Sequence, residues 1–535
     1  MRPTRLFLAL FIILLAGVLL SQTPAGQSVP AAGNQAAQMP ADMRAFSEAN
    51  SVKDLPAKIE ALCKFLEEYP DSKAAQFAVG SLIGAVAKEW PGNPAKMAAI
   101  GDRLLAITKD GVRGQSARQI AAALLESGKL EDAERFARIG VDDFTFDDFK
   151  KTYGGDEDII RGMFAAQRAG QLVALAQVER KLGKGAEARR LLEEAMSDNP
   201  GSAAARGLAD LSADTAEQLH WTIAAYVTSS SKTDRDRAES LYKKTHNDSL
   251  VGLEAVLDAE YNKLFPNPAH LERYHGKGKR TVLAELLTGS GCGPCIGQDL
   301  AFDALMERYS KTEVNFLLYH QNRPSPDPMT FPDSMARYDY YRARGVPTVA
   351  IDGKAKTGGA SRTGASQSAN ESAAAIDAAL QAEPGATLEL KALRNGQSIP
   401  VNVKIAGITR DATKVQLHIV VAENMLRYTG ENGIRFHPMV VRSVFQIPMQ
   451  GGAEKEIDHV FDIGRIGAEL KAYHDAYEKH DDRHNPDGTF RWPDRLEQID
   501  AGNLTVVAFL QDDVTMAILQ SASVDLSQGG DSHAR

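Results

Sequence analysis

Cysteine is scarce in this sequence, which has only three cysteines in 535 residues. Three thiols are too few to stabilise a chain of this length by cross-links, so a fold that depends on disulfide bonds is excluded. Two of the three lie together, in Cys292-Gly-Pro-Cys295. The third, Cys63, falls on the apolar face of a predicted helix. We interpret Cys63 as a buried, inert thiol, with a reactive thiol as the alternative.

Long apolar runs are also scarce, and the one that exists is N-terminal. Arg2 and Arg5 precede an unbroken apolar stretch over residues 6–20, which small and polar residues follow. This order predicts a secretory signal peptide over residues 1–25. An uncleaved membrane anchor is the alternative, because the run is only slightly short of a bilayer span. No cysteine follows the run, so a lipoprotein anchor is not favoured, and we expect a periplasmic or secreted protein without a stable membrane span.

The sequence has no basic stripe. Its formal net charge is −9, which argues against nucleic acid as a partner. With 43% hydrophobic and 24% charged residues, the composition is that of an ordinary globular protein. The length suggests about three domains.

The first of these domains is predicted to be helical. A flexible lead-in over residues 26–44 is rich in Ala, Gln, Gly and Pro, and a helical pattern then covers residues 45–265. Residues 125–136 and 181–191 resemble each other, since each has a helix end, a Gly-Lys turn and a second helix. The pairs are similar to tetratricopeptide repeats, although their spacing exceeds the period of about 34 residues. An irregular helical bundle is the alternative.

The Cys292–Cys295 motif carries the chemistry of the central domain. It follows an apolar run over residues 281–287, predicted to be a strand, and precedes a helical pattern over residues 296–309. A C-x-x-C between strand and helix is the order of a redox site. A helix N-terminus favours the thiolate of Cys292, which we expect to be the exposed nucleophile, and Cys295 would resolve the mixed disulfide. Gly293 and Pro294 suit a first helical turn.

The Cys-Gly-Pro-Cys string is identical to the active-site motif of thioredoxin, and the central region resembles the thioredoxin-like superfamily. A second matching element is Gly-Val346-Pro347-Thr-Val, which resembles the loop that carries a cis-proline opposite the cysteines. The resemblance covers about residues 277–382 and implies an α/β fold, a Cys292–Cys295 disulfide and a cis Val346–Pro347 bond beside the substrate backbone. It departs at Gly291, where the family usually has an aromatic residue.

Two other interpretations of the cysteine pair are a zinc half-site and a structural disulfide. Zinc needs further ligands, and no second C-x-x-C or H-x-x-x-H lies in the same domain. A disulfide that closes so short a loop adds little stability. Glu285, on the preceding strand, is a candidate for the buried carboxylate that the resemblance implies below the cysteines. The alternative is a polar residue at a strand edge, since one residue of register decides its face.

From about residue 384 to residue 528 the apolar period changes to two, which predicts an all-β, sandwich-like domain. Residues 435–442 are interpreted as a structural hairpin entering a strand. His480 and His484 have the spacing of a helical metal pair, with His474 nearby, but the zinc-protease pattern fails because its Glu is absent. We interpret these histidines as part of a solvated loop, with a metal site as the alternative.

The expected protein is therefore an exported thiol–disulfide oxidoreductase with a helical domain over residues 45–265, a thioredoxin-like domain over 276–383 and a β-domain over 384–528. Its expected partners are protein thiols and disulfides and a membrane or periplasmic electron donor, and no cofactor or metal is implied. Every group that the exchange requires lies between residues 277 and 382, so we expect that interval to carry the chemistry alone. The alternative is a cell-envelope binding protein with a non-catalytic scaffold, which a buried Cys292 would favour.

Overall fold

The computed structural model describes residues 39–155, 157–229, 231–449, 454–479, 485, 488–492 and 494–527. The chain divides into two compact units, Met1–Thr145 and Phe146–Arg535. The predicted signal peptide lies outside the described residues. Within the described ranges, no helix combines the length and the apolar character that crossing a bilayer requires.

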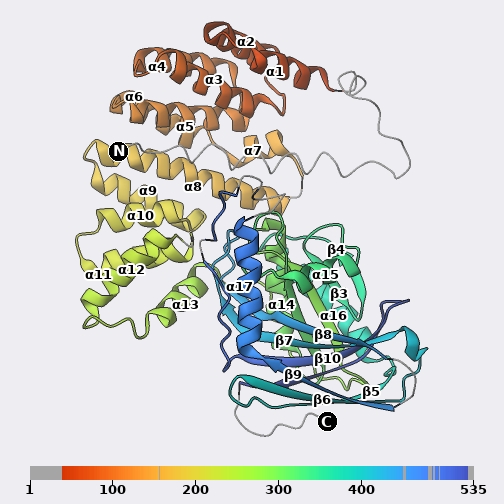
Figure 1. The fold of residues 1–535 in the computed structure, drawn as a ribbon. Coiled ribbons are helices and arrows are strands. Elements are labelled where there is room, and N and C mark those ends of the chain that lie inside the picture. The colour runs from red at the N-terminus through yellow and green to blue at the C-terminus, as the bar shows by residue number, and fades with distance from the viewer. Residues whose placement is uncertain are drawn as a thin grey trace. The chain divides into compact units, whose positions relative to one another are not determined.

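The described part of the first unit consists of helices (Figure 1). They are α1 (Ala41–Ser51), α2 (Leu55–Glu68), α3 (Ala75–Glu89), α4 (Pro94–Ile107), α5 (Asp110–Glu126) and α6 (Leu130–Asp142). Successive helices pack against each other, and α5 and α6 form the most extensive pair. Cys63 is buried on α2, and burial raises the pKa of its thiol to about 11, so the inert interpretation fits this position.

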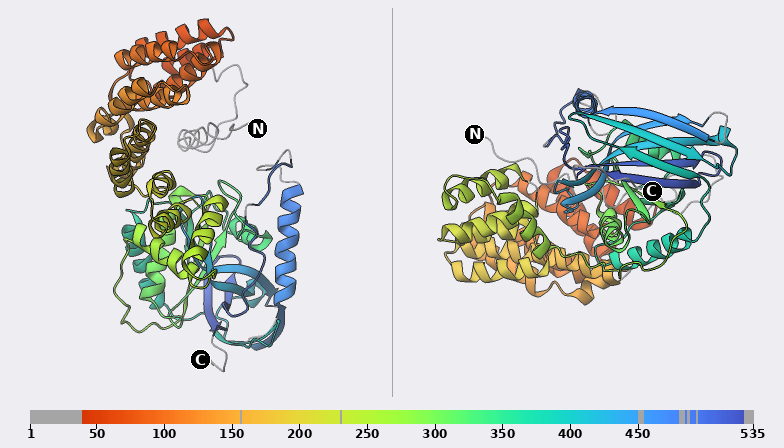
Figure 2. Two further views of the ribbon diagram at one scale, coloured as in Figure 1. Left: turned by 90° about the vertical axis from the view of Figure 1, so that its left-hand side faces the viewer. Right: turned by 90° about the horizontal axis from the view of Figure 1, so that it is seen from below.

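The second unit opens with further helices, which pack pairwise (Figure 2). They are α7 (Phe146–Tyr153), α8 (Glu157–Lys181), α9 (Gly185–Asp198), α10 (Ser202–Leu211), α11 (Thr215–Val227), α12 (Lys232–Thr245) and α13 (Leu253–Leu264). The predicted similarity of two helix pairs is present in their turns. Gly128 and Gly183 have φ of 77° and 79°, and each ends its helix with matching backbone bonds from the glycine and the following lysine.

The single helical domain expected over residues 45–265 differs from this arrangement, because the unit boundary falls after Thr145. In a stack of helix pairs each pair contacts only its neighbours. Sequence periodicity within the helices carries no sign of where such a run divides into two units. The helices α7–α13 belong to the unit that also contains the cysteine motif.

The described strands of the second unit form an eight-stranded sheet, in the order β11-β10-β7-β8-β2-β1-β3-β4, and a three-stranded sheet, β5-β6-β9. The strands of the large sheet are β1 (Val282–Thr288), β2 (Val314–His320), β3 (Thr348–Ile351), β4 (Lys354–Thr357), β7 (Val415–Arg427), β8 (Phe436–Pro448), β10 (Leu504–Asp512) and β11 (Ile518–Asp525). The small sheet contains β5 (Thr387–Ala392), β6 (Ser398–Ala406) and β9 (Glu454–Asp462), and α17 (Ile463–Lys479) follows β9.

The central strands are buried on both faces. β1 pairs in parallel with β2 and antiparallel with β3, and every residue of β1 and β2 is buried. Helices α14 (Ile296–Arg308) and α16 (Ala365–Leu380) pack together over one face, and α15 (Pro332–Tyr340) packs against β2 and β8. Continuous apolar strands of this kind are typical of a sheet covered by helices.

The separate sandwich expected over residues 384–528 is not what forms. β8 pairs in parallel with β2 through Leu318 and Val440, so strands from both expected domains share one sheet. One apolar core runs from β1 through β2 to β7, β10 and the small sheet. A two-layer contact does exist, since β5 packs on β10 and β11. Period-two alternation predicts half-buried strands, but it does not specify which strand each one pairs with.

Candidate functional site

The cysteine motif lies at the junction that the sequence predicts. β1 ends at Thr288, a short 3₁₀ turn covers Gly293–Cys295, and α14 begins at Ile296. Cys292 and Cys295 are joined by a disulfide bond. Cys292 is the residue that precedes the 3₁₀ turn and Cys295 the residue that precedes α14, so the sulfurs lie where unpaired backbone N–H groups favour a thiolate.

The exposure of the motif differs from the prediction. Gly293 and Pro294 are exposed, but Cys292 is only 2% exposed and Cys295 is fully buried. Cys292 is therefore not an exposed nucleophile in this disulfide-bonded state. A segment from outside the central region, the loop between β7 and β8, contacts the backbone of the motif through Asn432 and Ser290.

The Pro347 loop lies beside the cysteines, as the resemblance implies. The Val346–Pro347 peptide bond is cis, which confirms that prediction. Cys292 Sγ is 3.7 Å from the carbonyl oxygen of Val346. β3 begins directly after this loop and pairs with β1, so the sheet itself holds the two motifs together.

Gly291 sits in a space that neighbouring side chains already fill. A Cβ atom at this position would lie 3.0 Å from Glu431 Oε2 and closer still to Ser325 Oγ. Ser325 also donates a hydrogen bond of 2.9 Å to Glu431. An aromatic side chain at position 291 would therefore require Ser325 and Glu431 to move.

Glu285 is neither below the cysteines nor at a strand edge. It is fully buried on the central strand β1, and its carboxylate accepts hydrogen bonds of 2.7 and 2.8 Å from Arg337 of α15 and a further one from Tyr341. Thr288, three residues on, bonds to α14. Because side chains alternate along a strand, Glu285 faces away from the helix that begins after Cys295. Glu285 is thus the partner of a buried guanidinium.

Asp299 is a buried carboxyl group that the sequence analysis missed. It lies on α14, four residues after Cys295, and accepts a hydrogen bond of 2.8 Å from Thr288 Oγ1. Burial raises the pKa of Asp299 to about 7, and the hydrogen bond from Thr288 and the nearby His320 only partly offset this effect. Residues four apart share a helix face. That spacing is the signal from which Asp299 could have been predicted.

His320 and Asp327 form a second buried pair behind the motif. His320 ends β2 directly opposite Thr288, and its Nδ1 is 2.8 Å from Asp327 Oδ2. Asp327 also accepts a hydrogen bond of 2.7 Å from the backbone N–H of Ser290, so it ties the loop before Cys292 to β2. Burial raises the pKa of Asp327, but His320 and the backbone donors outweigh that effect and lower it. His320 Nε2 has no hydrogen-bond partner among the described residues.

The predicted histidine group is only partly described. His480 and His484 lie outside the described residues. His474 is buried rather than in a solvated loop, with Nδ1 3.3 Å from Glu497 and Nε2 3.1 Å from the carbonyl oxygen of Pro328. Where the structure describes the chain, no group of three or more His, Cys, Asp or Glu side chains is arranged to hold a metal ion.

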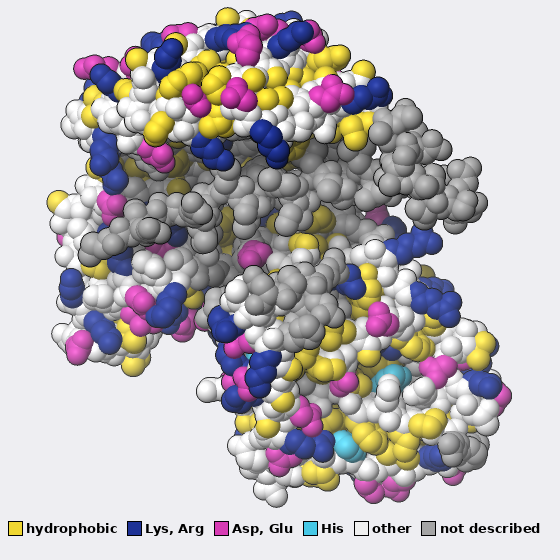
Figure 3. Space-filling view, turned by 45° about the horizontal axis from the view of Figure 1, so that its top comes forward, with side chains coloured by type: hydrophobic (Ala, Val, Ile, Leu, Met, Phe, Trp, Pro, Cys, Tyr) yellow, Lys and Arg dark blue, Asp and Glu magenta, His cyan; other side chains and the backbone are white. Residues whose placement is uncertain are grey.

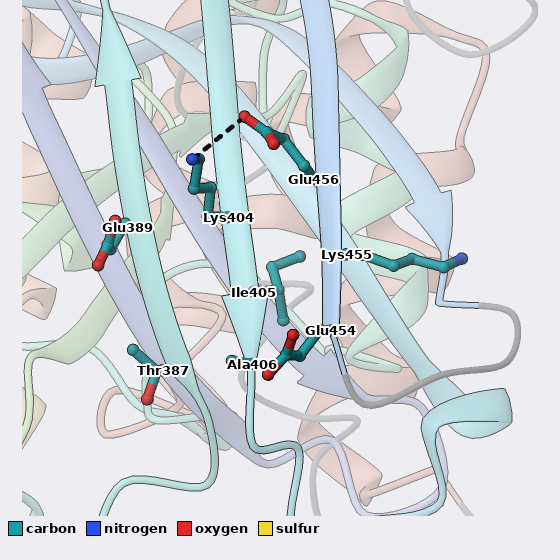
Figure 4. Close-up of a pocket in the computed structure, with 8 residues that line it drawn as sticks. All are labelled: Thr387, Glu389, Lys404, Ile405, Ala406, Glu454, Lys455 and Glu456. Atoms are coloured by element: carbon teal, nitrogen blue, oxygen red, sulfur yellow. Dashed lines mark ion pairs between the residues drawn. The ribbon is translucent and has the colours of Figure 1, made fainter.

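A hollow on the small sheet is separate from the cysteine motif. It lies on β5, β6 and β9, and Figure 4 shows that charged side chains line it. Lys404 and Glu456 form an ion pair of 3.5 Å at its rim. On the face drawn in Figure 3, basic and acidic side chains are interspersed, so no continuous basic area is visible there.

Comparisons with known proteins give little that bears on this site. No protein-family model matches the sequence, and no curated protein matches it. Among solved structures, HBP35 of Porphyromonas gingivalis is similar over 49% of this chain and 79% of its own, with 14% identity and a TM-score of 0.33. A structural-genomics protein from Agrobacterium tumefaciens is similar over 49% of this chain and 100% of its own, with 14% identity and a TM-score of 0.29. Similarities of this degree assign neither fold nor activity.

Proposed function

We propose that this protein is a thiol–disulfide oxidoreductase of the thioredoxin-like class, acting on protein thiols or disulfides through Cys292 and Cys295. The observation that carries the proposal is the juxtaposition of three parts. A Cys-Gly-Pro-Cys disulfide begins a helix, the Val346 carbonyl lies 3.7 Å from Cys292 Sγ, and the buried Asp299 lies one turn beyond Cys295. The parallel–antiparallel arrangement of β2, β1 and β3 supports a thioredoxin-like interpretation of this part of the sheet.

In the proposed exchange, a thiolate of a partner dithiol attacks Cys292 Sγ. A partner–Cys292 disulfide forms, the Cys292–Cys295 bond breaks, and Cys295 leaves with the electron pair. The partner's second thiolate then attacks the partner sulfur and releases Cys292, so two electrons pass from the partner to this chain. The same steps in reverse reduce a partner disulfide. The Val346–Pro347 loop would hold the partner backbone beside the sulfurs.

Asp299 is the group that we propose moves the proton of Cys295. A carboxyl group with a pKa of about 7 is present in both protonation states near neutral pH, as a general acid and base requires. In its protonated form it supplies a proton to the leaving Cys295 thiolate, and in its ionised form it accepts one in the reverse reaction. Glu285 has no such role, because Arg337 and Tyr341 occupy its carboxylate.

An exported location and an envelope electron donor remain part of the proposal. They rest on the apolar run over residues 6–20 behind Arg2 and Arg5, which is typical of a secretory signal. An oxidising compartment would also suit a chain that keeps one disulfide and few other thiols.

A second candidate function is a non-catalytic binding protein, and the burial of Cys292 favours it. Cys292 is only 2% exposed, so a protein thiolate cannot reach its sulfur unless the surrounding structure rearranges. In this alternative the disulfide fastens the start of α14, and the helices α7–α13 contribute the binding surface. The two candidates differ in whether a folded chain exchanges its disulfide with a protein.

Insulin reduction in the presence of dithiothreitol distinguishes the two candidates. We expect the chain to accelerate insulin precipitation, Cys292→Ala to abolish the acceleration, and Cys63→Ala to retain it as the matched control. A Cys295→Ala variant should accumulate a mixed disulfide through Cys292 when expressed in its host. A rate no faster than dithiothreitol alone, together with no trapped partner, would favour the binding protein.

A further inference from the structure

The loop of residues 428–435, here called the covering loop, packs directly on the cysteine motif. The backbone N–H of Asn432 donates a hydrogen bond of 2.9 Å to Ser290 O. The side-chain amide of Asn432 donates weaker bonds of 3.3 Å to Cys292 O and 3.4 Å to Gly289 O. Glu431 adds the contact with Ser325 beside Gly291. These contacts place the loop against the backbone around Cys292, beside a disulfide that is only 2% exposed at Cys292 although Gly293 and Pro294 are exposed.

Helix α13 holds both ends of the covering loop. Arg427 is the last residue of β7, and Arg435 directly precedes β8. Asp258 of α13 accepts a hydrogen bond of 2.8 Å from Arg427 through one carboxylate oxygen and one of 2.9 Å from Arg435 through the other. One side chain therefore bridges the two ends of the loop. Arg435 is 2% exposed and also pairs with Glu254 at 2.9 Å.

The loop has an apolar anchor as well. Ile434 is buried in a small cluster with residues of α14 and α16, among them Leu300 and Ala365. α14 is the helix that begins after Cys295. The loop therefore contacts the backbone of the redox motif through Asn432 and the helix that follows the motif through Ile434. Opening the loop at Glu431 and Asn432 breaks polar contacts only, whereas removing Ile434 would expose apolar surface. The tip is thus the part that can move at low cost.

We propose that the covering loop is a specificity-determining element that admits dithiols to Cys292, and that Asp258 of α13 sets how readily it opens. This inference rests on the proposed exchange reaction and adds to it the control of access. The attacking thiolate must reach Cys292 Sγ along the line of the S–S bond, and the loop tip has to leave Ser290 and Cys292 for that approach. A partner that binds the loop or α13 opens the site. A dithiol that makes no such contacts reacts only when the loop opens spontaneously.

The reaction that reports on opening is reduction of the Cys292–Cys295 disulfide by dithiothreitol. One dithiothreitol thiolate bonds to Cys292 while Cys295 leaves, and the second closes the dithiothreitol ring and releases Cys292. Two electrons pass to the protein, and the oxidised product is a cyclic disulfide. Dithiothreitol makes no contact with α13, so its rate measures spontaneous opening.

The test compares this rate in the full chain for three loosened variants and one control. Asn432→Ala removes the side-chain bonds to Gly289 and Cys292 and the bond of 3.0 Å that Asn432 Oδ1 accepts from Ile434 N–H within the loop. Ser325→Ala removes the contact with Glu431, and Asp258→Asn removes the charge that joins Arg427 and Arg435. Asp236→Asn is the matched control, because it makes the same change of charge at a site away from the loop. Asp236 forms an exposed ion pair with Lys232 on α12. Acid quenching, alkylation and mass spectrometry give the reduced fraction with time.

We expect each loosened variant to be reduced at least about fivefold faster than wild type, since that factor corresponds to one lost hydrogen bond and Asn432→Ala removes more than one. Asp236→Asn should keep the wild-type rate. Circular dichroism checks that each variant is folded, and if Asn432→Ala is not, Ser325→Ala and Asp258→Asn decide the question.

Unchanged rates in the folded loosened variants would overturn the role of the loop, while insulin reduction by wild type would leave the proposed function standing. The opposite outcome is also informative. If wild type fails the insulin assay but the loosened variants react faster with dithiothreitol, the result supports control of access by the covering loop and counts against the proposed oxidoreductase activity. If no folded variant is reduced at all, the covering loop does not control access and the inference is wrong.

Discussion

The replacement Asp299→Asn should make the protein more stable and less active at the same time. Asn keeps the shape of the side chain and can still accept the hydrogen bond from Thr288 Oγ1, which is 2.8 Å in the wild type. It removes only the ability to ionise. Any effect that depends on pH therefore belongs to the carboxyl group itself.

The magnitude follows from the pKa. Burial raises the pKa of Asp299 from 3.8 to about 7, which corresponds to about 4 kcal/mol. The folded state holds the proton more tightly than the unfolded state, so between pH 4 and pH 7 the unfolded state has fewer protons bound. The free energy of unfolding therefore falls as the pH rises through this window, and the loss is complete above pH 7. Asn does not ionise, so the free energy of unfolding of Asp299→Asn should not fall in this way.

The assay is hydrogen exchange with mass spectrometry on the α14 peptides in increasing urea, with the disulfide kept oxidised. At pH 8 the variant should be more stable than wild type by up to about 4 kcal/mol, and at pH 4.5 the difference should shrink to about 1 kcal/mol. Insulin reduction by the same variant should fall by about 100-fold and lose its inflection near pH 7. A variant that is less stable at pH 8, or a stability difference that does not depend on pH, would refute the reasoning.

Two further predictions concern Glu285 and Gly291. Glu285→Gln leaves the buried Arg337 without its counter-charge, so urea unfolding should show that the free energy of unfolding falls by about 3–5 kcal/mol. The pH profile of insulin reduction should keep its inflection near pH 7. Loss of that inflection would mean that Glu285 takes part in proton transfer. Gly291→Ala crowds Ser325 and Glu431 and should lower the free energy of unfolding by about 1–3 kcal/mol in the same measurement. Adding Ser325→Ala should recover part of that loss, and strictly additive effects would mean that the two sites are not in contact.

The sequence predicts well what is local. An apolar run, the Cys-Gly-Pro-Cys string and a helical pattern lie next to each other in the chain, so β1, the turn and α14 could be predicted in order. The Pro347 loop followed because its motif precedes a strand that pairs with β1. Asp299 was within reach as well, since it lies four residues after Cys295 on the same helix.

Two features could not be predicted from the sequence, because they depend on strand register and on pairing between strands far apart in the chain. A shift of one residue along β1 moves a side chain to the other face, so the face of Glu285 was undetermined from the sequence. In the structure its carboxylate pairs with Arg337 of α15. Glu431 and Asn432 reach the motif only because β7 and β8 continue the sheet beyond β2. No periodicity within residues 415–448 specifies β2 as the neighbour of β8.

This pairing reverses the expectation for an isolated central region. A fragment over residues 270–385 lacks β8, so its β2 would be an unpaired, apolar edge, which is prone to aggregation. It also lacks Gln511, whose side-chain oxygen accepts a hydrogen bond of 2.7 Å from the buried Arg337. Ile518 of β11, whose backbone oxygen accepts a hydrogen bond of 2.9 Å from Arg280, is missing as well.

We therefore expect the fragment over residues 270–385 to be insoluble or to unfold without cooperativity, whereas residues 146–527, which include every described element of the second unit, should fold and reduce insulin at the rate of the full chain. Size-exclusion chromatography, thermal unfolding and the insulin assay on both fragments test this. A soluble, active 270–385 fragment would show that β8 contributes nothing essential to the site.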